Sequence, residues 1–329
     1  MLNPLAVALG DPAGIGPEIV AKAWERRKTE GLSPFFAVGD GAGIMAVWKG
    51  PVRTIAEPSE ALACFDNSLP LIQIDGGGIP APGQQSLKGA RNSLDALELA
   101  VGLTRSGAAS GLVTGPVCKA QLYAIGFAHP GQTEFVAERC GVASDLVAMM
   151  LAGPTLRTVP VTSHIPLMKV SEVLTTDLIV AKGRATIRGL RRQFGIERPR
   201  IAVAGLNPHA GEDGMLGREE IDIVMPAIGR LREEEADITG PHAADTMFHP
   251  RARGAYDAAL CLYHDQALVP LKALHFDDGV NMTLGLPIVR TSPDHGTAFA
   301  IAGKNQAHPG AMIAALNMAS ACAHRIGQA

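Results

Sequence analysis

The chain has 329 residues, of which 47% are hydrophobic and 19% are charged, and its formal net charge is -3 at pH 7. This length suits two domains of about 150 residues each, and a charged fraction below the roughly 25% of average soluble proteins excludes a disordered, charge-rich chain. The lack of a basic excess argues against binding to a nucleic-acid backbone or to an anionic membrane surface.

Short apolar runs alternate with helical patterns in the first part of the chain. The runs at 5–10, 35–39, 69–74 and 111–115 predict buried strands. Helices are predicted from Pro17, where proline takes a first helical position, and over 91–107, where leucines form an apolar face. This alternation predicts an α/β fold with a largely parallel sheet.

The same pattern continues along the rest of the chain. Further strands are predicted at 146–153, 156–163, 200–206 and 257–263, and amphipathic helices at 175–195 and 217–237. No linker divides the chain by composition, so we place the crossing between domains near the segment GFAHPGQTE at 126–134.

Neither a membrane span nor a disulfide framework is predicted. No apolar run reaches about 18 residues, and the N-terminus lacks the pattern of a signal peptide, so we expect a cytoplasmic protein. The five cysteines are widely spaced and never form a CxxC pair, which predicts small buried hydrophobic residues.

A glycine-rich turn, GDPAGIGPEI, follows the first predicted strand and opens the first helix. Gly14 and Gly16 allow backbone N–H groups to approach a ligand at the helix N-terminus. The turn matches neither dinucleotide nor P-loop fingerprints, so a simple strand-to-helix connection explains it equally well.

All ten histidines lie at or after His129. Three of them, His164, His209 and His264, directly follow predicted strands, and the carboxyl ends of parallel strands are where ligands bind. Each imidazole alone is more often structural, but three in this position predict a divalent metal site with an open coordination position.

Carboxylates lie beside these histidines. We expect Asp245 and Asp265 to be functional, as a base, a metal ligand or a group that orients a histidine. Loop or cap positions explain the other carboxylates, which are Glu212, Asp277 and Asp278.

Polar and cationic residues follow in the C-terminal part. Lys272, Asn281 and Arg290 suit an anionic substrate, because arginine grips carboxylate or phosphate bidentately and lysine adds a point charge. The polar turn that follows contains Asp294, His295 and Gly296, and it could let a flat ligand approach the backbone.

Ordered motifs along the whole chain resemble those of the 4-hydroxythreonine-4-phosphate dehydrogenase family of pyridoxal phosphate biosynthesis. The motifs are GDPAGIGPEI, HPGQTEF, PVTSHIPL, GLNPHAGE, GPHAADTMF, YHDQALVPLK, GVNMTLGLPIVRTSPDHGTAF and IAGK. The resemblance implies a two-domain α/β/α fold of the isocitrate/isopropylmalate dehydrogenase type. It also implies a homodimer with the active site in the interdomain cleft at the dimer interface.

The resemblance implies a discontinuous first domain, 1–128 plus 288–329, with a cofactor-binding C-terminal loop. The second domain, 129–287, would bind metal and substrate and carry the dimer interface. NAD or NADP would contact Asp294, His295 and Gly296, because HGTAFAIAGK is similar to the adenine-side loop of isopropylmalate dehydrogenases.

The family motifs also imply roles for the remaining candidates. A divalent ion (Zn, Mg or Co) would be held across the dimer interface by His164, His209 and His264. The substrate, a phosphorylated hydroxy amino acid, would contact Gln132, Thr133, Lys272, Asn281 and Arg290. The hydroxyl proton would pass to one of three candidate catalytic groups, Lys272, Asp245 or Asp265.

The sequence departs from the family pattern at two positions. The family usually has histidine where this chain has Gln132, and glutamine cannot become cationic near neutral pH. The family commonly has glycine where this chain has Ala267.

The implied reaction is oxidation of a secondary alcohol by hydride transfer, followed by loss of carbon dioxide. An alternative in the same family is a dehydrogenase of D-threonate or D-erythronate 4-phosphate, which Gln132 keeps open. Alternatives from other classes are a metal-dependent lyase or hydrolase without a redox cofactor, and a ligand sensor. The complete set of predicted site residues disfavours the sensor and relatives that oxidise aromatic cis-dihydrodiols.

Overall fold

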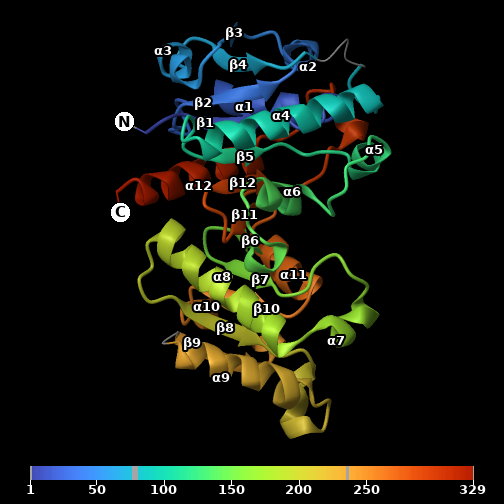
Figure 1. The fold of residues 1–329 in the computed structure, drawn as a ribbon, viewed down its shortest axis with the longest axis vertical. Coiled ribbons are helices and arrows are strands. Elements are labelled where there is room, and N and C mark those ends of the chain that lie inside the picture. The colour runs from blue at the N-terminus through green and yellow to red at the C-terminus, as the bar shows by residue number, and fades with distance from the viewer. Residues whose placement is uncertain (1, 76–80, 235–236, 329) are drawn as a thin grey trace. The chain divides into compact units, whose positions relative to one another are not determined.

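The computed structural model describes residues 2–75, 81–234 and 237–328. The chain forms two compact units, drawn in Figure 1. Unit 1 comprises Met1–Cys140 and Pro287–Ala329, and unit 2 comprises Gly141–Leu286. The first unit is therefore discontinuous in sequence.

Unit 1 contains a parallel sheet with the strand order β3-β4-β2-β1-β5-β12. The strands are β1 (Leu5–Ala8), β2 (Phe35–Gly39), β3 (Val52–Thr54), β4 (Leu69–Gln73), β5 (Leu112–Thr114) and β12 (Arg290–Pro293). Strands β1, β2, β5 and β12 are buried along their full length, as expected for a parallel sheet covered by helices on both faces.

The long helices of unit 1 are α1 (Gly16–Glu25), α4 (Leu87–Arg105) and α12 (Gly310–Ile326). Ser86 caps α4 by accepting a hydrogen bond from the Gly89 N–H at 3.0 Å. Helix α4 packs on β1 and β2, and α12 packs on β12 (Figure 1). Shorter helices are α2 (Gly41–Val47), α3 (Ala61–Cys64), α5 (Lys119–Ala124) and α6 (Gln132–Arg139).

The first boundary between the units lies later than the predicted position at residue 129. Helix α6 belongs to unit 1, where the ring of Phe135 packs on that of Phe127 with their centroids 5.6 Å apart. Arg139 pairs with Glu98 of α4 at 2.8 Å. These contacts keep 129–140 with the N-terminal residues, although no change of composition marks Cys140 as a boundary.

Unit 2 contains a mixed sheet with the strand order β11-β6-β7-β10-β8-β9. The strands are β6 (Ala148–Ala152), β7 (Arg157–Pro160), β8 (Arg200–Ala204), β9 (Asp237–His242), β10 (Ala258–Cys261) and β11 (Val280–Leu284). Strands β7, β10, β8 and β9 are parallel, whereas β6 is antiparallel to β7 and β11. The short connection from β6 to β7 requires this, because a parallel crossover needs about a dozen residues.

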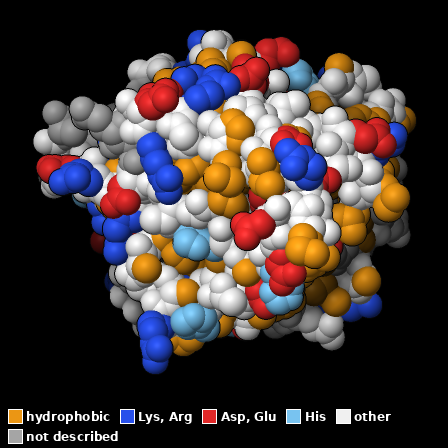
Figure 2. All heavy atoms as spheres, turned by 90° about the horizontal axis from the view of Figure 1, so that it is seen from below, with side chains coloured by type: hydrophobic (Ala, Val, Ile, Leu, Met, Phe, Trp, Pro, Cys, Tyr) orange, Lys and Arg blue, Asp and Glu red, His pale blue; other side chains and the backbone are white. Residues whose placement is uncertain are grey.

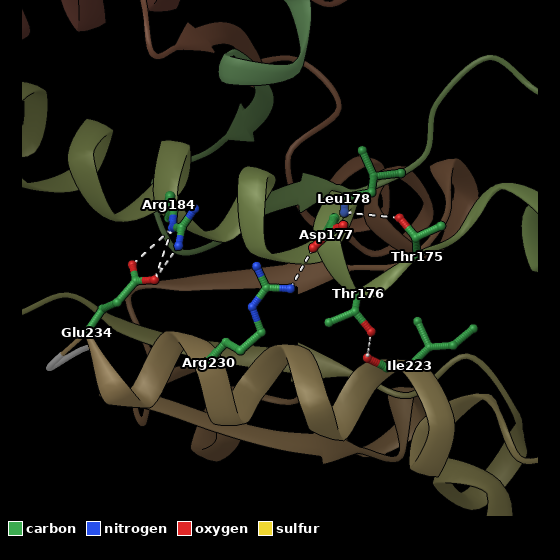
Figure 3. Close-up of polar contacts among 8 residues, drawn as sticks. All are labelled: Thr175, Thr176, Asp177, Leu178, Arg184, Ile223, Arg230 and Glu234. Atoms are coloured by element: carbon green, nitrogen blue, oxygen red, sulfur yellow. Dashed lines mark hydrogen bonds and ion pairs between the residues drawn. The ribbon is translucent and has the colours of Figure 1, made fainter.

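The helices of unit 2 include two that pack along each other, α8 (Thr176–Phe194) and α9 (Met225–Glu233). Figure 3 shows the polar contacts between them, in which Arg230 reaches Asp177 at 2.6 Å and Arg184 reaches Glu234 at 3.0 Å. The hydrogen bond from Arg184 holds the pKa of Glu234 below its ordinary value. The other helices are α7 (Val170–Val173), α10 (Pro250–Arg253) and α11 (His264–Leu274).

The cysteines and the hydrophobicity of the helices bear on two further predictions. The five cysteines are free, as predicted, but of the five only Cys64, Cys261 and Cys322 are buried, whereas Cys118 and Cys140 are partly exposed. Among the residues that the structure describes, no helix combines the length and the hydrophobicity needed to cross a bilayer.

The turn after β1 gives a test of the fold. Gly10 has φ +76°, and a Cβ there would lie 2.3 Å from the carbonyl oxygen of Pro116. Gly107 has a similar φ of +79° but open space around it. We expect Gly107→Ala to cost the about 1–2 kcal/mol of a left-handed Cβ, and Gly10→Ala to cost more, in the free energy of unfolding measured with urea. Equal losses of unfolding free energy in the two variants would contradict the close approach of Gly10 to Pro116.

Candidate functional site

The loops that follow β1, β5 and β12 meet at the carboxyl end of the sheet of unit 1. The Asp11 N–H donates to the Pro116 carbonyl oxygen at 2.9 Å, and the Ile15 N–H donates to the Thr297 carbonyl oxygen at 3.0 Å. Burial raises the pKa of the Asp11 carboxyl. The glycine-rich turn therefore lies against the loop of the predicted cofactor residues, which are Asp294, His295 and Gly296.

Two of the predicted substrate residues begin helix α6. Gln132 Nε2 donates to the Gly115 carbonyl oxygen at 3.2 Å, which leaves its Oε1 buried with no hydrogen-bond partner among the described residues. Gln132 and Thr133 lie in the first turn, where backbone N–H groups have no partner within the helix. Such a helix start suits an anionic group.

Arg290 reaches the same place from β12. Its side chain donates from Nη2 to Thr114 Oγ1 at 2.7 Å, one residue before the Gly115 that binds Gln132. Arg290 is only 3% exposed, and this burial lowers its pKa to about 10, while the Glu134 carboxylate acts in the opposite direction. The guanidinium therefore stays protonated at neutral pH. Unit 1 brings Gln132, Thr133 and Arg290 together around the end of β5.

The three predicted metal ligands lie at one edge of the sheet of unit 2. His164, His264 and His209 come after β7, β10 and β8, which are neighbouring parallel strands. The rings of His164 and His264 have their centroids 5.6 Å apart. Both rings line a cavity of about 210 Å³, together with Thr162, Ile165, Leu167, Val170, Tyr263 and Asp265.

His164 and His209 both have left-handed backbone conformations, with φ of 55° and 53°. The left-handed turn at His209 continues through Ala210, Gly211, Glu212 and Asp213. Such conformations cost about 1–2 kcal/mol for each residue with a Cβ, and they persist where function or surrounding contacts require them. Two of the predicted ligands thus share an uncommon backbone conformation.

The three imidazoles do not form a complete metal site within one chain. Among the described residues, no group of three or more His, Cys, Asp or Glu lies close enough to hold a metal ion. Among the described residues, the ring contact between predicted ligands is that of His164 and His264, while His209 lies exposed in its left-handed turn. The donor chemistry still suits a metal, since Asp265 bonds His264 Nδ1 at 2.6 Å and leaves Nε2 for ligation.

The other predicted residues of unit 2 are spread over several elements. Asp245 is exposed in the turn after β9, and Lys272 is half-buried on α11. Asn281 lies on β11, and its buried Oδ1 has no hydrogen-bond partner among the described residues. Asp278 pairs with His275 at 3.3 Å, which agrees with the loop position expected for it.

Two buried polar residues near the histidines were missed by the sequence analysis. Gln266 is 7% exposed and Glu220 is 2% exposed. Gln266 follows the His264-Asp265 pair directly, and this position was the only signal for it. Glu220 lies in a predicted amphipathic helix rich in charges, where a carboxylate looks like a surface residue.

The left-handed backbone at His209 can be tested by comparing two substitutions. At an exposed helical position such as Arg188 of α8, alanine should be more stable than glycine by about 1 kcal/mol. At His209 the alanine variant should be no more stable than the glycine variant, or should be less stable. The reason is that alanine, unlike glycine, has a Cβ that is strained in the left-handed region. Urea unfolding of the four variants measures both differences. The same alanine advantage at both positions would show that the turn is not left-handed in solution.

Comparison with known proteins identifies the family. The family model described as "Pyridoxal phosphate biosynthetic protein PdxA" matches residues 36–319. The chain belongs to the PdxA family. It is 59% identical to the 4-hydroxythreonine-4-phosphate dehydrogenase of Zymomonas mobilis, over 98% of this chain and 96% of that protein. It is 54% identical to the enzyme of the same name from Erythrobacter litoralis, over 98% and 97% of the two chains.

A solved structure extends the similarity to three dimensions. The crystal structure of 4-hydroxythreonine-4-phosphate dehydrogenase from Klebsiella pneumoniae superimposes with a TM-score of 0.87 at 36% identity. The superposition covers 98% of this chain and 99% of that one. Members of the PdxA family thus share this fold along the whole chain.

Proposed function

We propose that this PdxA-family protein is an NAD(P)-dependent oxidoreductase that oxidises 4-hydroxythreonine 4-phosphate in pyridoxine 5'-phosphate biosynthesis. The observation that carries the proposal is 59% identity to an enzyme of this name over 98% of the chain. The product, 2-amino-3-oxo-4-(phosphooxy)butanoate, then loses carbon dioxide to give 3-amino-2-oxopropyl phosphate. The substrate hydroxyl loses a proton and its carbon loses a hydride to the nicotinamide.

The phosphate of the substrate would bind in unit 1. The start of α6 supplies backbone N–H groups, and Arg290 supplies a buried positive charge beside it. The Oε1 atom of Gln132 can accept a hydrogen bond from a hydroxyl or ammonium group of the substrate. Lys272 and Asn281 would complete the substrate contacts from unit 2, where the unsatisfied Asn281 Oδ1 suits a polar ligand.

The histidines of unit 2 would hold the divalent ion. Imidazole nitrogen atoms of His164, His209 and His264 suit Zn, Co or, less commonly, Mg. A bound ion of this kind lowers the pKa of a hydroxyl and polarises the carbonyl that replaces it. Asp265 would orient His264, and Lys272 or Asp245 would take the hydroxyl proton.

A second subunit would complete the ligand set, so we propose a homodimer. Large hydrophobic side chains are exposed a few residues after each histidine in the sequence: Leu167 and Met168, then Met215 and Leu216, then Val269 on α11. Met168 and Met215 are each 85% exposed. Figure 2 shows hydrophobic side chains next to histidines and carboxylates on the face that it draws. Exposed apolar groups clustered around a functional site are typical of a protein interface.

The nicotinamide cofactor would bind in unit 1. The loop of Asp294, His295 and Gly296 lies against the glycine-rich turn, and the two follow β12 and β1, which lie on either side of β5 in the parallel sheet. This is the edge at which α/β sheets bind ligands. We expect the active site to lie in the interdomain cleft at the dimer interface, as in the isocitrate/isopropylmalate dehydrogenase type of fold.

The decisive experiment is an assay of the purified protein with 4-hydroxythreonine 4-phosphate and NAD or NADP. We expect reduced cofactor to accumulate, to stop with a chelator and to resume when a divalent metal is added back. His209→Ala should abolish turnover and weaken metal binding. No reduced cofactor under any metal condition would refute the proposal, and metal-dependent substrate loss without cofactor would favour a lyase.

Gln132 tests the choice of substrate. Replacing it with histidine restores a group that becomes cationic near neutral pH, so we expect a changed KM for the phosphorylated substrate and a changed pH dependence. Assays of both forms with 4-hydroxythreonine 4-phosphate, D-threonate 4-phosphate and D-erythronate 4-phosphate measure the effect. If neither KM nor substrate preference moves, Gln132 does not contact the substrate.

A further inference from the structure

Two hydrogen bonds to the carbonyl oxygen of Leu262 link two of the histidine-bearing loops. The Leu262 carbonyl oxygen lies between β10 and His264, and it accepts from the N–H of Thr162 at 3.3 Å and from Thr162 Oγ1 at 2.8 Å. Thr162 is two residues before His164. The loops that carry His164 and His264 are therefore joined directly.

Gln266 extends this connection to the third loop. Its Oε1 accepts from the Leu262 N–H at 2.7 Å, and its Nε2 donates to the Gly205 carbonyl oxygen at 2.7 Å. Gly205 follows β8 and begins the segment that leads to His209. Both ends of one buried amide are thus used to fix the spacing between the ends of β10 and β8.

Glu220 holds the third loop from the other side. Its Oε1 accepts from the N–H groups of Leu206 and Asn207, both at 2.7 Å, and its Oε2 accepts from Asn207 Nδ2 at 2.9 Å. A Cβ on Gly211 would lie 2.7 Å from Glu220 Oε2, so the left-handed turn packs directly on this carboxylate.

These hydrogen bonds keep the strained left-handed turn at His209 in place. A left-handed run is stable only when surrounding contacts over-determine it, and a buried carboxylate is tolerated only when donors satisfy it. Glu220 and the segment before His209 meet both needs at once. The hydrogen bonds given above for Gln266 and Glu220 run to backbone groups and to the Asn207 side chain, so their influence passes through the backbone of the loops.

We propose that Gln266 and Glu220 are positioning residues that hold the three histidine-bearing loops in register and thereby set the affinity for the divalent metal ion. This inference rests on the proposed function, because it takes the three histidines as the metal ligands. Residues that orient metal ligands from behind commonly change metal affinity by about 10–100-fold when replaced.

The test measures Zn²⁺ binding by titration calorimetry in the full-length protein, alongside thermal unfolding without metal. Gln266→Leu and Glu220→Leu should weaken Zn²⁺ binding by about 10–100-fold. Glu220→Gln should recover most of the affinity, because its amide oxygen still accepts from Leu206 and Asn207. Hydrogen exchange of those two amides should be faster in Glu220→Leu than in Glu220→Gln.

Gln193→Leu is the matched control. Gln193 is also a buried glutamine of unit 2, but it lies near the end of α8, and no hydrogen bond links it to the histidine-bearing loops in the described part of the chain. It should leave Zn²⁺ affinity unchanged. A purely structural role would make Gln266→Leu behave in the same way.

The outcomes separate this inference from the function on which it rests. If the wild type binds Zn²⁺ and His209→Ala weakens binding, but Gln266→Leu and Glu220→Leu bind as tightly as Gln193→Leu, the positioning role is refuted. If the wild type binds no Zn²⁺, the proposed metal site fails and the inference fails with it. Should Glu220→Leu not fold, Gln266→Leu decides by the same comparison.

Discussion

The parallel pairing of β7, β10 and β8 is the constraint on which the placement of the three histidine-bearing loops depends. Because these strands run in one direction and lie side by side, the loops that leave them must emerge at one edge. That arrangement places three histidines from distant parts of the sequence within one region of unit 2. It also explains why the Gln266 side chain, which follows β10, can bond the backbone at the end of its own strand and at the end of the neighbouring β8.

In unit 1 the carboxyl edge of a parallel sheet likewise brings together polar groups from distant parts of the sequence. Its carboxyl edge gathers backbone N–H groups at α6 and a guanidinium that is nearly excluded from water. Burial disfavours the charged form of Arg290, yet its pKa of about 10 keeps it cationic at neutral pH. Burying a charge costs more than burying an apolar side chain, and on the proposed function the anionic substrate would offset that cost together with the Glu134 carboxylate.

Much of the fold follows from the sequence. The short apolar runs at 5–10, 35–39 and 200–206 were predicted to be buried strands, and they contain β1, β2 and β8. The histidines at strand ends were likewise predictable from order along the chain. The boundary after Cys140 was not, because it depends on ring packing and an ion pair that leave no mark in composition. Glu220 was hidden for a similar reason: only its folded partners distinguish a buried carboxylate from a surface one.

The exposure of the histidine-bearing loops bears on how the proposed metal ion would be acquired. On the proposed function, a lone subunit offers an incomplete ligand set bordered by apolar side chains such as Met168 and Met215. Metal binding and subunit association are then linked by one coupling free energy, so each must strengthen the affinity of the other by the same factor. Dilution would release the ion as well as the partner, and scarcity of the ion would limit how much of the chain is assembled.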